Sequence, residues 1–194
     1  MTTLPTRMTF LITFLGPFHI GSGSPDDGPD SPVDREVPLP ASGLKGLMRA
    51  QAQHQAGVPV PLVEEIFGSR SHESAWLWTD AEFAVAPEPE KVARLKLADT
   101  DDGAAETGFL MLAEHLWATE ATFTVSSRRA LTDDELRRHC LVLRAAARSI
   151  SGLGGSRRRG EGWVTVVDLA DEDSPSTWTV DESRQLLALT EVPA

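Results

Sequence analysis

Cysteine and long apolar runs are scarce in this sequence, and both absences limit the class of protein. Cys140 is the single cysteine among 194 residues, which excludes an internal disulfide framework and favours a reducing compartment. The longest apolar run, Met8–Leu15, is far too short to cross a bilayer, and residues 1–7 lack the pattern of a signal peptide. We therefore expect a cytoplasmic protein without a membrane partner.

The sequence also lacks an excess of positive charge. It has 18 lysines and arginines against 29 aspartates and glutamates, a formal net charge of −11, which by itself argues against a nucleic-acid partner. Between positions 128 and 159, however, only Asp133, Asp134 and Glu135 oppose a cluster of positive charges. The local field of such a cluster permits an anionic ligand. Its members are nine of the 18 basic residues: Arg128, Arg129, Arg137, Arg138, Arg144, Arg148, Arg157, Arg158 and Arg159.

Hydrophobic periodicity divides the chain into strands and helices. Two segments that flank a polar turn, Val92–Leu97 and Phe109–Trp117, predict a protruding hairpin over about residues 92–118. Among the tryptophans we assign Trp76, Trp78 and Trp163 to the core, and Trp117 either to packing or to stacking on a base. The other predicted strands are Met8–Leu15, Trp76–Val85, Ala121–Ser126 and Trp163–Leu169; the predicted helices are Ser42–Gln55 with Ser42 as its N-cap, Thr132–Ile150 with Thr132 as its cap, and Asp181–Leu189. The stripe that predicts the second helix is Leu136, Cys140, Leu143, Ala147 and Ile150.

The order of these elements predicts an α+β fold. It reads strand, helix, strand, hairpin, strand, helix, strand, which is the βαββαβ order of ferredoxin-like and RNA-recognition domains. We expect a single domain over residues 1–194, with a core at about 7–169 and a short C-terminal extension at 170–194. A fold shared by many proteins does not by itself assign a function.

The glycine-rich stretch Gly152–Val164 is the most informative local feature. It contains five glycines and three consecutive arginines, and it follows a predicted helix and precedes a predicted strand. Glycine allows close approach of the bare backbone, and arginine donors match phosphate oxygens. A helix C-cap at Gly152 is the alternative explanation. The length and charge of the stretch favour a loop that cradles a polyanion.

Five short motifs occur in a fixed order between about Phe10 and Asp168. They are Pro17–Gly23 (PFHIGSG), Asp30–Arg35 (DSPVDR), Leu39–Arg49 (LPASGLKGLMR), Ile66–Ser69 (IFGS) with Asp80 and Ala81, and Leu153–Val164 (LGGSRRRGEGWV). In this order they resemble the RAMP superfamily, specifically the repeated backbone subunits of type III CRISPR effector complexes. The resemblance covers most of the chain.

The resemblance implies a subunit that polymerises along a guide RNA and whose hairpin acts as a thumb between guide and target. Its partners would be the guide crRNA, complementary target RNA, further copies of itself and other effector subunits. By position in the motifs, the implied RNA-binding residues are His19, Gly21, Ser22, Gly23, Ser42, Lys45, Arg49, Gly154, Gly155, Ser156, Arg157, Arg158, Arg159 and Gly160. For Lys45 and Arg49 the alternative is a solvated helix face, and for His19 a satisfied structural histidine.

The resemblance also implies that an aspartate in the first long loop cuts the target RNA. Asp30 matches that position, and Asp26, Asp27 and Asp34 in the same loop are rival candidates. Attack by the 2′-hydroxyl of the RNA needs only a carboxylate with Mg²⁺ or another divalent cation, and we expect no organic cofactor. Turn formation is the alternative role for an aspartate beside proline and glycine.

Two other functions stay open. A non-catalytic RAMP subunit would coat or cap the guide RNA without cutting target. A guide-processing endoribonuclease of the same superfamily is less favoured, because such enzymes usually carry two ferredoxin-like halves and a histidine acid–base, whereas this chain has one glycine-rich signature. The sequence therefore favours a guide-binding, target-cleaving subunit over these two alternatives.

Overall fold

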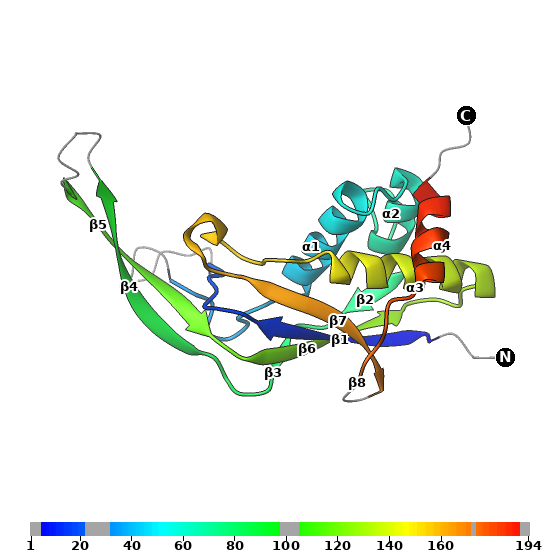
Figure 1. Cartoon of the computed structure of the whole chain (residues 1–194), viewed down its shortest axis with the longest axis horizontal. Helices are drawn as coiled ribbons and strands as arrows, with labels where there is room; N and C mark the ends of the chain where they lie inside the picture. The colour runs from blue at the N-terminus through cyan, green and yellow to red at the C-terminus, as the bar shows by residue number, and fades with distance from the viewer. Residues whose placement is uncertain (1–4, 22–31, 98–104, 172–173, 191–194) are drawn as a thin grey trace.

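The computed structural model describes residues 5–21, 32–97, 105–171 and 174–190. It confirms a mixed α+β structure built on antiparallel sheets (Figure 1). The main sheet has the strand order β2-β6-β1-β7-β8, and β3 also pairs with β6. The strands of this sheet are β1 (Arg7–Phe14), β2 (Trp76–Trp78), β3 (Glu82–Phe83), β6 (Glu120–Ser127), β7 (Val164–Asp171) and β8 (Ser174–Pro175).

Strand β1 lies in the centre of the main sheet because its alternate side chains are large and apolar. Met8, Phe10, Ile12 and Phe14 are all buried, as the period of two predicts. The ring of Phe10 stacks on that of Phe123 in β6 at 5.1 Å between centroids. β1 pairs antiparallel with both β6 and β7, so the two later strands enclose the first.

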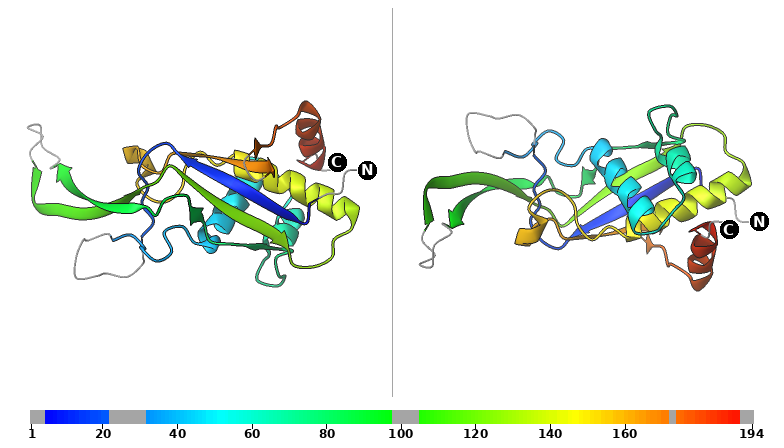
Figure 2. Two further views of the ribbon diagram at one scale, coloured as in Figure 1. Left: turned by 90° about the horizontal axis from the view of Figure 1, so that it is seen from below. Right: turned by 90° about the horizontal axis from the view of Figure 1, so that it is seen from above.

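The helices cover one face of the main sheet (Figures 1 and 2). The stripe predicted for α3 is buried throughout, and Thr132 caps the helix in a reciprocal pair of hydrogen bonds with Glu135. Among the described residues, no helix is long and apolar enough to cross a membrane. The helices are α1 (Ala41–His54), α2 (Val60–Phe67), α3 (Asp133–Arg148) and α4 (Val180–Thr190).

The hairpin of β4 (Glu88–Leu97) and β5 (Ala105–Trp117) forms a separate two-stranded sheet that projects from one end of the molecule (Figure 1). It starts earlier than the predicted residue 92. Pro89 is tolerated because it stands opposite Leu116, whose amide and carbonyl both bond to Phe18 instead. The missing amide of Pro89 therefore costs no ladder hydrogen bond.

Two predictions about element boundaries are wrong. Ser42 is not the N-cap of α1: Pro40 is, and the amide of Ala41 donates to a carboxylate oxygen of Asp80 at 2.7 Å. The predicted strand 76–85 is split into β2 and β3, because the amide of Ala81 turns away to the carbonyl of Leu39 at 3.0 Å. Both corrections arise from contacts between segments about 40 residues apart.

Candidate nucleic-acid interface

The glycine-rich loop between α3 and β7 is folded against the segment that follows β1. The amide of Gly162 donates to the carbonyl of Pro17 at 2.7 Å, and that of Gly155 to the carbonyl of His19 at 2.8 Å. Within the loop, the amide of Leu153 donates to the carbonyl of Gly162 at 2.9 Å. Two of the motifs therefore form one structural unit.

Two glycines of this loop are required by the close approach of backbone to backbone. Gly154 has a φ of 72° and Gly162 a φ of 76°. A Cβ at Gly154 would overlap the carbonyl oxygen of His19, and a Cβ at Gly162 would overlap that of Leu153. Since positive φ also disfavours residues with a Cβ, these glycines build the loop itself, whatever ligand it binds.

The loop lines a hollow of about 660 Å³ at the surface, which we call the loop hollow. Ser156 has a φ of 57°, and Arg157–Arg159 form one 3₁₀ turn on its rim. In the part of the chain that the structure describes, the lining carries two guanidinium groups and no carboxylate, which suits an anionic ligand. The lining residues are Gly154, Gly155, Ser156, Arg157, Arg159 and Trp163.

His19 lies beneath this loop and connects it to the hairpin. Its side chain is buried, and Nδ1 lies 2.6 Å from the carbonyl oxygen of Glu114 in β5. Because a carbonyl only accepts, Nδ1 carries a proton. The carboxylate of Glu114 in turn accepts from the amide of Val33 and from the guanidinium of Arg35, at 3.3 and 2.7 Å. These contacts give His19 a structural role, and its predicted contact with RNA stays a prediction.

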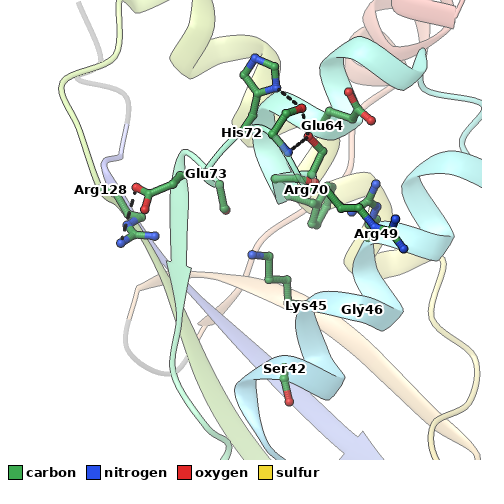
Figure 3. A pocket seen from close by; sticks show the side chains of 14 residues that line it. Ser42, Lys45, Gly46, Arg49, Glu64, Arg70, His72, Glu73 and Arg128 are labelled. Atoms are coloured by element: carbon green, nitrogen blue, oxygen red, sulfur yellow. Dashed lines mark hydrogen bonds and ion pairs between the residues drawn. The ribbon is translucent and has the colours of Figure 1, made fainter.

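A second and larger hollow, of about 980 Å³, lies between α1 and the loop that follows α2 (Figure 3); we call it the α1 hollow. It brings together Ser42, Lys45 and Arg49, which the sequence motifs assign to RNA binding, with Arg70 and Arg128, which lie outside that assignment. Arg70 directly follows the predicted Ile66–Ser69 motif, which was the available signal. The full lining is Ser42, Lys45, Gly46, Arg49, Glu64, Phe67, Gly68, Ser69, Arg70, Ser71, His72, Glu73, Ser74 and Arg128.

The cations of this hollow are close enough to disturb one another. Burial lowers the pKa of Lys45, and the positive charges of Arg128 and Arg49 lower it further. The Lys45 ammonium lies 5.4 Å from the centroid of the Trp78 ring, while Arg49 donates to the carbonyl of Gly68 at 2.8 Å. A bound anion would relieve the mutual repulsion of these groups.

Acidic groups neutralise only part of the positive charge in the α1 hollow. Glu64 and Glu73 also line it, and Glu73 lies 3.9 Å from the guanidinium of Arg128. Figure 1 shows α1 and the glycine-rich loop on the same side of the main sheet. The backbone segments that line much of both hollows therefore lie on the helix-covered side of the sheet.

The candidate catalytic loop is described only at its ends. Asp26, Asp27, Asp30, Ser22 and Gly23 lie outside the described residues. Among its rivals, Asp34 is within them, and its Oδ1 accepts from the amides of Glu36 and Val37 at 3.0 and 2.8 Å. This is turn formation, the alternative role. Gly21, predicted to bind RNA, forms a bridge with Val33. No cluster of three potential metal ligands occurs among the described residues.

The burial of the tryptophans agrees only in part with the prediction. Trp76 is buried and Trp78 is half-buried, as expected of core residues. Trp163 is wrongly assigned to the core, because it is 50% exposed and lines the loop hollow. Trp163 directly precedes β7, and the next residue, Val164, is the one whose side chain is buried. Trp117 is also exposed, and its indole N–H donates to Glu90 at 2.9 Å.

Two solved structures share the fold of this chain. A chain of the Type III-B Cmr-beta complex in its apo state superposes with a TM-score of 0.66 and 14% identity, over 85% of this chain and 98% of that one. A chain of the Cmr-beta complex bound to cognate target RNA gives a TM-score of 0.62 and 14% identity, over 84% and 96%. No curated protein sequence matches the chain.

The match to a protein-family model is broader than the individual motifs. The model of the RAMP superfamily matches residues 11–165. That range begins within β1, ends within β7 and includes both hollows. With the family model over most of its length and the fold shared with the Cmr-beta chains, this protein belongs to the RAMP superfamily.

Proposed function

We propose that this chain is a guide-RNA-binding subunit of a type III CRISPR effector complex. The observation that carries the proposal is the pair of cation-lined hollows at α1 and at the glycine-rich loop, the motifs that the RAMP resemblance assigns to RNA. Phosphate contacts position a nucleic acid without reading its sequence. The chain should therefore bind guides of any sequence, with strong dependence on salt.

The architecture supports this proposal in finer detail. The main-sheet order β2-β6-β1-β7 with crossing helices is what a ferredoxin-like, RNA-recognition fold would have. The β4–β5 hairpin, which projects beyond the sheet, is proposed as the thumb between guide and target. Further copies of the chain and other subunits would complete the RNA site, and so we expect the isolated, acidic protomer to bind RNA weakly.

The binding proposal is tested by reversing charge in the α1 hollow. We expect Lys45→Glu with Arg49→Glu to lower affinity for single-stranded RNA. The slope of log K against log salt should also fall by about one for each phosphate that the variant no longer neutralises. The matched control is Arg137→Glu with Arg138→Glu, an equal change of charge on exposed residues of α3. Equal affinity and slope in both double variants would contradict the proposal.

Target cleavage by Asp30, with Mg²⁺ or another divalent cation, is the second part of the proposal. The engagement of Asp34 in a turn favours another aspartate of the loop as the reactive one. Purified complex with its guide is mixed with end-labelled complementary RNA, with and without Mg²⁺. We expect regularly spaced, metal-dependent cuts by the wild type, none by Asp30→Ala, and wild-type cutting by Asp34→Asn, which keeps the turn acceptor.

Each other outcome of this experiment has a clear meaning. Stable target binding without cuts in any protein would make the chain a non-catalytic scaffold. Unchanged cutting by Asp30→Ala would move the reactive carboxylate to Asp26 or Asp27, whose alanine variants are then compared in the same assay.

A further inference from the structure

Trp163 presents an apolar ring beside the cations of the loop hollow. Its side chain is 50% exposed, although the residues on either side of it in the chain belong to a tightly folded loop and to strand β7. Arg157 and Arg159 line the same hollow. A flat apolar surface next to two phosphate-binding groups matches the two parts of a nucleotide.

The backbone of Trp163 is held on both sides. Its carbonyl accepts from the amide of Leu15 at 2.8 Å, and the residue forms a bridge with Gly152. Its neighbour Gly162 is fixed by a hydrogen bond to Pro17 at 2.7 Å. Within the described residues, no hydrogen bond, ring stack or cation contact of the indole is found. The backbone thus fixes the position of the ring, and half of the side chain stays open to solvent.

We propose that Trp163 stacks on a base of the RNA strand whose phosphates are held by Arg157 and Arg159. This rests on the proposed RNA-binding function and adds a contact to the bases. Aromatic side chains stack on bases of any identity, and such stacking is strong enough to lower affinity about ten-fold when a single ring is removed. A rigid ring also costs little conformational entropy on binding.

Charge favours RNA over a protein as the occupant of this surface. The described lining holds guanidinium groups and no carboxylate, and an apolar protein segment would leave those charges desolvated without partners. Single-stranded RNA supplies both phosphates for the guanidinium groups and a base for the ring.

The test compares two short oligomers of equal length, one of adenosine nucleotides and one whose nucleotides lack bases. We expect Trp163→Leu to weaken binding of the adenosine oligomer by about ten-fold and to leave the abasic oligomer unchanged. Trp163→Phe, which keeps a stacking ring, should retain most of the affinity. The adenosine oligomer should also quench indole fluorescence of the wild type more than that of Trp163→Phe.

Trp178→Leu is the control, since Trp178 lies between β8 and α4, outside the hollow. Wild-type binding by Trp163→Leu, or an equal loss in Trp178→Leu, would overturn the stacking proposal and leave phosphate binding intact. A change of oligomeric state in Trp163→Leu with unchanged affinity would overturn it in favour of a protein contact. Failure of the wild type to bind either oligomer would overturn the RNA-binding function as well.

Discussion

At the scale of single residues, the two hollows are formed by glycines with different roles. Gly154 is required because a side chain there would overlap the carbonyl of His19 at a positive φ. Gly46, in the middle of α1, leaves open space of at least 4 Å around the position that a Cβ would take. The same substitution should therefore change stability in opposite directions at the two positions.

We expect Gly154→Ala to lower the free energy of unfolding by about 1–3 kcal/mol, the cost of a strained backbone residue. Gly46→Ala should raise it by about 0.5–1 kcal/mol, because alanine loses less conformational entropy in a helix. Urea unfolding of both variants measures the difference. A stable Gly154→Ala variant would mean that the His19 segment can move away from the loop.

At the scale of elements, the hairpin and the glycine-rich loop are joined by a nearly buried ion pair. Arg94 of β4 donates to Glu161 of the loop at 2.7 Å, and their side chains are only 13% and 10% exposed. Nδ1 of His115 in β5 lies 4.0 Å from the same carboxylate oxygen. These charged groups therefore connect the hairpin to the glycine-rich loop.

Removing one partner of this pair should be worse than removing both. Arg94→Met leaves the Glu161 carboxylate poorly compensated, which costs about 3 kcal/mol for a buried pair. The double variant Arg94→Met, Glu161→Gln should recover part of that loss, since no charge is left without its partner. Thermal unfolding gives the stabilities, and hydrogen exchange of β4 and β5 reports whether the hairpin loosens. Additive losses in the double variant would argue against a coupled pair.

At the scale of the whole molecule, the clustered arginines have two different uses. Arg144 and Arg148 donate to the buried carboxylate of Asp168 at 2.7 and 3.0 Å, and thereby attach α3 to β7. Arg157 and Arg159 line the loop hollow without a carboxylate beside them in the described lining. The charge segregation seen in the sequence is therefore only partly available to a ligand.

This division predicts opposite outcomes for two equal substitutions. Arg148→Met should lower the free energy of unfolding by about 2 kcal/mol, the value of a hydrogen bond to a charged group, and leave RNA affinity unchanged. Arg159→Met should leave stability unchanged and reduce the salt slope of RNA binding by about one. Denaturation and binding titrations on both variants distinguish the two uses. Loss of RNA affinity in Arg148→Met alone would contradict the division.

The sequence by itself determined the elements whose signals are local. Alternating apolar residues in β1, the apolar stripe of α3 and its Thr132 cap all act within a few residues, so pattern and structure agree. The spacing of Lys45 and Arg49 likewise places both on one side of α1, lining one hollow. The ordered motifs were sufficient to identify the family because they follow the chain and need no contacts.

The tertiary structure alone decided features that depend on segments far apart in the chain. Asp80 replaces Ser42 in satisfying the start of α1, and the carbonyl of Leu39 interrupts the strand after β2. The exposure of Trp163 was also decided this way, because an apolar side chain is buried only where another element covers it. Local sequence determines which backbone conformation a segment prefers, whereas burial, charge pairing and the shape of a hollow depend on which distant segments meet there.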